Sequence, residues 1–118
     1  MFKEELKNLT ARIPSARGAI IMGLDGIAVE KYGASDGVNL EAFSAEYLGL
    51  LKKTIETNRE LGIGRVQELT VFTESLVAII KAVTPEYFLI CALAGHSNFG
   101  QARYELRKSV LRLAKEFV

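Results

Sequence analysis

Histidine and cysteine are almost absent from this sequence of 118 residues, which holds one of each. A single cysteine cannot form an internal disulfide, so we expect the chain in a reducing cytoplasm. Catalytic triads and metal sites need several such side chains at matched spacing. Neither His96 beside Ser97 nor Cys91 in an apolar run provides that. An enzyme built on these residues is the least favoured hypothesis, and we expect no cofactor and no metal.

An excess of charge of one sign is also missing, since 15 basic residues face 14 acidic ones and the net charge is +1. This balance argues against a nucleic-acid surface. No apolar run approaches the ~20 residues that span a bilayer, so we expect no membrane insertion. The opening segment MFKEELKNL carries acidic residues, so we do not expect it to be a signal peptide. The length and the 49% hydrophobic content are typical of one globular domain over residues 1–118.

The segment from Asn39 to Leu61 is predicted to be a long amphipathic helix, with Asp36 or Asn39 as its cap. At 100° per residue its apolar side chains fill an arc of roughly 160°. That arc is wider than a helix needs to lie on a sheet, so another part of the domain or a second copy of the chain must cover its flank. The apolar residues are Leu40, Phe43, Tyr47, Leu48, Leu50, Leu51, Ile55 and Leu61.

Before this helix, the pattern predicts a short helix and a hairpin. Apolar residues at helical spacing run from Phe2 to Ile13, and Pro14 ends that helix. Ala16–Leu24 is apolar on both faces, as in a central strand. Asp25-Gly26 predicts a type I′ turn leading into an edge strand over Ile27–Tyr32.

After the long helix, which we expect to end at Gly62, three strands and a closing helix are predicted. The strands cover Val66–Glu74, Leu76–Val83 and Tyr87–Ala94. Asn98 or Ser97 is expected to cap the last helix. The apolar stripe of that helix comprises Phe99, Ala102, Leu106, Val110, Leu113 and Phe117.

The resulting order, α-β-β-α-β-β-β-α, predicts an α+β fold with a single antiparallel sheet. The two strands that are apolar on both faces should be neighbours in the middle, and the more polar strands should be the edges. This reasoning gives the strand order 2-1-5-4-3. The long helix should cross one face, and the two terminal helices should cover the other.

The predicted edge strand Val66–Glu74 presents Leu69, Val71 and Phe72 with little to prevent pairing with another chain. Alternatively, Glu68 and Glu74 protect this edge, or a loop covers it. We favour pairing, because the adjoining long helix also has surplus apolar surface.

Two segments, GAIIMGLDGIAVEKY and NFGQARYELRKSVLRL, together with the order of elements, resemble the roadblock/dynein-light-chain family. The resemblance covers essentially the whole chain, which corresponds to a single roadblock-like, longin-like domain. The residues that match the family's entry into its last helix are Gly100, Ala102, Arg103, Tyr104, Glu105, Leu106 and Arg107.

The resemblance implies a homodimer in which the third strands join into one continuous sheet and the long helices lie side by side. This agrees with the open edge and the wide apolar arc. The expected dimer interface comprises Phe43, Tyr47, Leu50, Thr54, Leu69, Val71 and Phe72.

The resemblance also implies a non-enzymatic regulator of a Ras-like small GTPase. Bacterial members of the family activate or bind such a GTPase in motility and polarity through the long-helix side, and they supply no catalytic residue. The alternative is a scaffold or adaptor that binds other roadblock or longin-like chains. The expected GTPase-binding residues are Glu46, Lys53, Glu56, Arg59 and Glu60.

Overall fold

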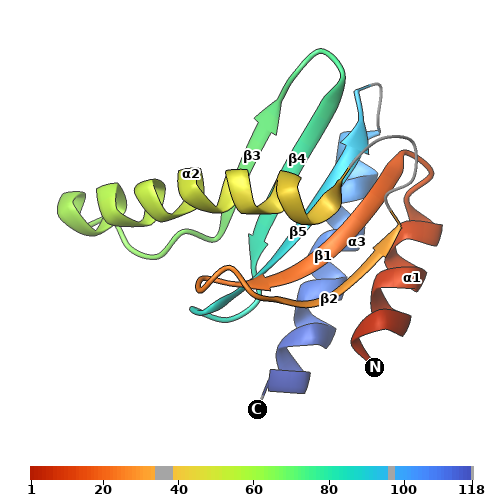
Figure 1. Cartoon of the computed structure of the whole chain (residues 1–118), viewed down its shortest axis with the longest axis horizontal. Coiled ribbons are helices and arrows are strands. Elements are labelled where there is room, and N and C mark those ends of the chain that lie inside the picture. The colour runs from red at the N-terminus through yellow and green to blue at the C-terminus, as the bar shows by residue number, and fades with distance from the viewer. Residues whose placement is uncertain (34–38, 96–97, 118) are drawn as a thin grey trace.

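A computed structural model of the chain describes residues 1–33, 39–95 and 98–117. The order of elements is the predicted one (Figure 1). The elements are α1 (Phe2–Arg12), β1 (Ala16–Gly23), β2 (Ala28–Gly33), α2 (Leu40–Leu61), β3 (Glu68–Phe72), β4 (Leu76–Ala82), β5 (Tyr87–Ala94) and α3 (Phe99–Ala114), followed by a short 3₁₀ turn, η1 (Lys115–Phe117).

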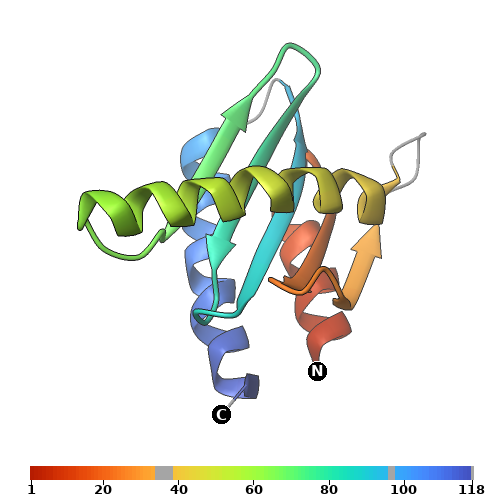
Figure 2. The same cartoon turned by 60° about the vertical axis from the view of Figure 1, so that its left-hand side comes forward.

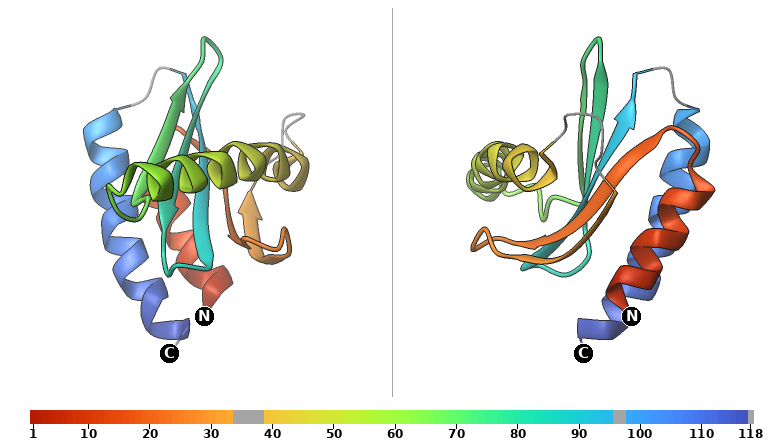
Figure 3. Two further views of the ribbon diagram at one scale, coloured as in Figure 1. Left: turned by 90° about the vertical axis from the view of Figure 1, so that its left-hand side faces the viewer. Right: turned by 45° about the vertical axis from the view of Figure 1, so that its right-hand side comes forward.

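The five strands form one sheet in the order β2-β1-β5-β4-β3, with every neighbouring pair antiparallel. Helix α2 lies across one face of this sheet, while α1 and α3 lie together on the other (Figure 3). The predicted fold class, strand order and distribution of helices are therefore confirmed.

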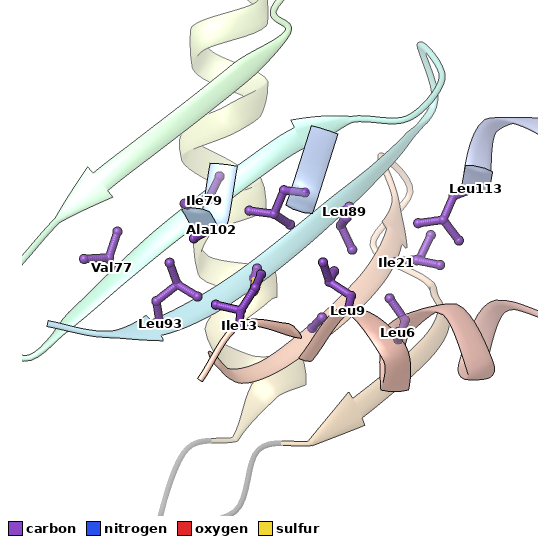
Figure 4. Packing of buried hydrophobic residues seen from close by; sticks show 13 residues of the cluster. Leu6, Leu9, Ile13, Ile21, Val77, Ile79, Leu89, Leu93, Ala102 and Leu113 are labelled. Carbon is purple, nitrogen blue, oxygen red and sulfur yellow. The ribbon is translucent and has the colours of Figure 1, made fainter. Parts of the chain in front are cut away.

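The core consists of two apolar layers, because successive side chains of a strand point to opposite faces. In β1, Ala19 and Ile21 pack toward α1 and α3, whereas Ile20 and Met22 pack toward α2. Strands β4 and β5 alternate in the same way. Figure 4 shows the first layer, in which Leu6 and Leu9 of α1 and Ile13, just after the helix, lie against the sheet. The other labelled residues of this layer are Ile21, Val77, Ile79, Leu89, Leu93, Ala102 and Leu113.

Both ends of α2 carry the caps that the sequence indicates. The Asn39 side chain accepts a hydrogen bond from the Ala42 N–H at 3.0 Å, so Asn39 is the N-cap. At the other end Gly62 has a left-handed φ of 66°. Its N–H donates to the Arg59 carbonyl, and the Ile63 N–H donates to the Asn58 carbonyl, the pattern of a Schellman cap. The alternative caps Asp36, for α2, and Ser97, for α3, lie outside the described residues.

The turn between β1 and β2 differs from the prediction. The Gly26 N–H donates to the Gly23 carbonyl at 2.9 Å, so Leu24 and Asp25 are the central residues and Gly26, with φ 86°, is the fourth. The predicted type I′ turn, centred on Asp25-Gly26, was wrong. The Asp25 carboxylate accepts from the Ile27 N–H at 3.0 Å, and the left-handed glycine completes a three-residue loop with a bulge.

Strand β3 is shorter than the predicted Val66–Glu74. At its start Val66 is buried against the α2 side of the sheet. At its end the Thr73 N–H donates to the Leu76 carbonyl at 2.9 Å, and the Thr73 hydroxyl accepts from the Leu76 N–H at 3.0 Å. These bonds make Thr73 part of the turn rather than of the strand.

We expect Leu106→Ala to destabilise the fold by about 2–5 kcal/mol, because Leu106 is fully buried in the layer between α3 and the sheet. The matched control is Leu111→Ala on the same helix, whose side chain is 64% exposed and whose loss should change stability by less than about 0.5 kcal/mol. Urea unfolding measures both. Equal losses in the two variants would contradict the assignment of the buried face of α3.

Candidate interaction surface

Helix α2 covers the sheet with only one of its faces. Its buried residues are Leu40, Ser44, Leu48 and Leu51. The helix crosses the sheet, and its C-terminal half extends past β3 (Figure 2). A large part of its surface is therefore available for other contacts.

The first such surface is an apolar stripe, here called the α2 seam, which comprises Phe43, Tyr47, Leu50, Thr54 and Leu61. Its first four members alternate in steps of four and three residues, the spacing of helices that pack side by side. Phe43 and Tyr47 pack against the apolar layer between α2 and the sheet, and their ring centroids are 4.9 Å apart. Leu50 is 46% exposed and Leu61 is 65% exposed. The wide apolar arc thus divides into a part that packs on the sheet and a part, at Leu50 and Leu61, that the described residues leave exposed.

The second surface, here called the α2 outer stripe, comprises Glu46, Lys53, Glu56 and Glu60, all exposed. Their spacing of seven, three and four residues places them on one side of the helix. Within the described residues none of the four has an oppositely charged partner at ion-pair distance, whereas Glu41 on the same helix pairs with Lys31 of β2. Arg59, expected to belong with them, lies elsewhere on the helix and faces a hollow next to the sheet.

The third surface is the edge of the sheet at β3. Leu69 packs into the layer under α2, and Val71, two residues on, shares its face. Phe72 points to the other face, where its ring lies 4.3 Å from that of Phe99, and it is 65% exposed. The strand residues predicted for the dimer interface are therefore divided between the two faces, and no described strand pairs with the outer backbone edge of β3.

Glu68 ties this edge strand to α3 instead of protecting the edge. Its carboxylate forms an ion pair with Arg103 of α3, accepts from the Thr70 hydroxyl at 2.7 Å and lies 3.4 Å from the Lys81 ammonium. Burial raises the pKa of Glu68, but the hydrogen bonds from Arg103 and Thr70 and the charges of Arg103 and Lys81 outweigh it and lower the pKa overall. The carboxylate is therefore occupied on the α3 side of the strand.

The residues considered for catalysis have a structural role or lie outside the described part. Cys91 is fully buried in the sheet, and burial raises the pKa of its thiol to about 12, which keeps it protonated and unreactive. His96 and Ser97 lie outside the described residues. Among residues 1–33, 39–95 and 98–117 no three His, Cys, Asp or Glu side chains are grouped as a metal site would require. In the same part of the chain no helix is long and apolar enough to cross a bilayer.

The family model of the Roadblock/LC7 domain matches residues 2–94, which is most of the chain. The chain belongs to the Roadblock/LC7 family. The match includes α1 and all five strands but ends before α3, so the segment Gly100–Arg107, on which the resemblance of the sequence depended most, lies outside it.

Solved Roadblock/LC7 structures share this fold. Myxococcus xanthus MglB superimposes with a TM-score of 0.88 at 13% identity, covering 98% of this chain and 93% of that one. The gliding protein MglB of Thermus thermophilus gives 0.85 at 17% identity over 95% and 84%. Myxococcus xanthus MglC is 30% identical over 96% of both chains, with a TM-score of 0.68. None of the curated proteins matches the sequence.

Sequence reasoning did not find the hollow that Arg59 faces. It is formed by residues from α2, from the α2–β3 connection and from the β1–β2 and β4–β5 turns, which are far apart along the chain. Arg65, its second arginine, follows two glycines in a connection without regular structure. No local pattern links Arg65 to Arg59, so only the fold brings them together.

Glu68 should make stability depend on acid pH. The pKa of Glu68 is lower in the folded state than in the unfolded state, where it is about 4.3. Its contribution to the free energy of unfolding is therefore complete at pH values above the unfolded pKa, and it is lost as pH falls through the folded pKa. We expect Glu68→Gln to cost roughly 1 kcal/mol at pH 7 and to flatten the fall in stability between about pH 5 and pH 3. Urea unfolding at several pH values measures this. The control Glu46→Gln should keep the wild-type slope, and an unchanged slope in Glu68→Gln would contradict the role of the ion pairs.

Proposed function

We propose that this Roadblock/LC7 chain is a homodimeric, non-enzymatic regulator of a Ras-like small GTPase, as an activating or binding partner in bacterial cell polarity or motility. The observation that carries the proposal is α2, which has an apolar seam and a charged outer stripe that the rest of the described chain does not cover. Membership of the Roadblock/LC7 family and the fold shared with a gliding protein, MglB, support a regulatory role of this class.

The α2 seam supports pairing with a second copy of the chain. Its apolar members are at the spacing of a helix pair, and its polar member Thr54 donates its hydroxyl to the Leu50 carbonyl at 2.9 Å. Thr57, between Thr54 and Leu61, likewise donates to the Lys53 carbonyl at 2.9 Å. Because both hydroxyls are satisfied inside the helix, a partner helix would cover them without leaving a buried polar group unpaired.

The open β3 edge supports the same pairing. Alternate residues of the strand, Glu68, Thr70 and Phe72, turn their backbone groups away from β4, and no described strand pairs with them. An antiparallel copy of the strand would satisfy these groups and extend the sheet. Leu69 and Val71 are on the same face of the sheet as the seam, so strand pairing and helix pairing can occur in one interface.

The outer stripe supports binding of a protein partner. Three carboxylates and one ammonium group give it a net charge of −2, and no described residue of opposite charge lies within ion-pair distance of any of them. Charged surfaces of this kind steer association and discriminate between partners more than they supply affinity. The proposed partner surface is therefore predominantly basic.

Val71→Arg should separate the dimer, because the added charge would have to be buried at the paired edge. We expect the dimer dissociation constant to rise by at least about 100-fold, equivalent to ~3 kcal/mol. Sedimentation velocity over a concentration series measures this. The matched control is Val29→Arg on β2, the opposite edge strand, which should remain dimeric. A Val71→Arg variant that still sediments as a dimer would show that the chain does not pair through β3.

The regulatory role is tested with Ras-like small GTPases from the source genome, each loaded with GDP or with a non-hydrolysable GTP analogue. We expect binding that depends on the nucleotide and that weakens about tenfold in Glu46→Lys/Glu56→Lys, since the stripe becomes positive. The control Glu4→Lys, on exposed α1 surface, should bind as the wild type does. Isothermal titration calorimetry measures affinity, and phosphate release measures any effect on hydrolysis.

Two outcomes would count against this role. If neither nucleotide state binds, the chain is not a GTPase regulator. If the chain binds only other roadblock or longin-like proteins in the same assay, the scaffold or adaptor function replaces it.

A further inference from the structure

A hollow of about 560 Å³ lies beneath the C-terminal half of α2, where the chain returns from the helix to β3. Figures 1 and 2 show this part of α2 extending past the sheet, with the connection to β3 curving back below it. The residues that line the hollow are Leu24, Ile55, Arg59, Arg65, Val66, Gln67, Ala82, Val83, Thr84, Pro85 and Phe88.

The floor of this hollow is apolar. Phe88 and Val66 belong to the layer under α2, and Ile55 and Leu24 pack against the same layer from the helix and from the β1–β2 turn. The volume is within the range of pockets that hold a ligand of several residues or a drug-sized molecule, and it is too large for a single ion. The floor therefore offers a place for one or two large apolar side chains.

Two cations, Arg59 and Arg65, line the same hollow. Arg12, Arg103 and Arg112 form ion pairs with glutamates, whereas Arg17 and Arg107 form none with the described residues. Neither Arg59 nor Arg65 has a carboxylate within ion-pair distance among the described residues. A guanidinium group binds carboxylates through a rigid fork of N–H donors, so two free ones beside an apolar floor favour an anionic ligand with an apolar part.

The hollow continues in two directions, and the charged side chains at its two ends differ in sign. A second hollow of about 360 Å³ shares Ile55, Arg59, Arg65 and Val66 and extends along the end of α2 to Gly62 and Gly64. At the other side, a small hollow beside Leu24 is lined by Asp25 and Glu86. Those two carboxylates would repel a ligand that is negative along its whole length, such as a nucleic acid. The arrangement fits an extended chain that is acidic near the arginines and neutral near Asp25.

The site lies on a different side of α2 from the α2 seam, while Arg65, Val66 and Gln67 directly precede the β3 edge. Arg59 is roughly 150° around α2 from the middle of the α2 seam. Ile55 points toward the sheet layer and not toward the seam. A second copy packed along the seam would therefore leave the hollow accessible.

We propose that this Arg59–Arg65 hollow binds an acidic peptide segment of a partner protein. One or two apolar side chains of the segment pack on Ile55, Val66 and Phe88, and its Asp or Glu side chains pair with Arg59 and Arg65. The site adds a second kind of partner to the proposed function and does not depend on it, because the outer stripe and the hollow involve different side chains.

The test is a selection from a random dodecapeptide phage library on the purified protein, followed by fluorescence polarisation with the selected peptides. We expect the selected peptides to combine acidic and large apolar residues and to bind at least tenfold more weakly to Arg59→Glu/Arg65→Glu. The control, Arg107→Glu on the exposed face of α3, makes one Arg-to-Glu exchange on the other side of the sheet and should bind as the wild type does. Thermal melts establish that the variants are folded.

A charge exchange makes the test specific. Peptides in which Lys replaces the acidic residues should bind the Arg59→Glu/Arg65→Glu variant and not the wild type. The proposal is overturned if selection yields no acidic and apolar peptides, or if the peptides bind the double variant unchanged. The proposal is also overturned if Arg59→Glu/Arg65→Glu weakens binding to phosphatidylserine vesicles but not binding to the peptides. The ligand would then be a lipid surface.

Discussion

The need to cover both faces of one sheet determines the architecture of this protein. Strands β1 and β5 are apolar on both sides, so helices must lie on each face, and α2 must cross the sheet because it connects β2 at one edge to β3 at the other. The crossing helix is longer than this task requires. Its 22 residues extend about 33 Å at 1.5 Å per residue, whereas four spacings between five strands cover only about 19 Å. The C-terminal half of α2 therefore extends beyond the sheet.

The extra length gives α2 surfaces that the fold does not use. Leu48 and Leu51 hold the helix on the sheet, and the Schellman cap at Gly62 ends it cleanly although this end has no sheet beneath it. The remaining faces then carry different chemistry: the α2 seam is apolar, the outer stripe is charged, and the side toward the α2–β3 connection encloses a hollow with two arginines. Under the proposed function, one helix would serve folding, self-association and binding through different residues.

The fold could be predicted from the sequence because local patterns distinguish strands that are buried on two faces from edge strands. Tyr87–Ala94 is an uninterrupted run of apolar residues, whereas β2 mixes apolar and charged residues. The caps at Asn39 and Gly62 are equally local. Details that depend on single hydrogen bonds were not predictable: the Asp25 carboxylate fixes one turn and the Thr73 hydroxyl ends β3 early. The candidate site was predictable in part. Helical spacing groups Glu46 with Lys53, but it gives no information on Arg65, which only the folded connection brings near Arg59.

The positions of the seam and the outer stripe also constrain how a partner would be bound. Their centres are roughly 100° apart around α2. When two copies of the helix lie side by side along the seam, both outer stripes face the same side of the dimer and meet near its two-fold axis. A partner as large as a small GTPase is itself asymmetric, so it cannot make the same contacts with both copies at once. One bound partner would then cover parts of both stripes and hinder a second, whereas the two Arg59–Arg65 hollows, on the far sides of the helices, would remain separate and equivalent.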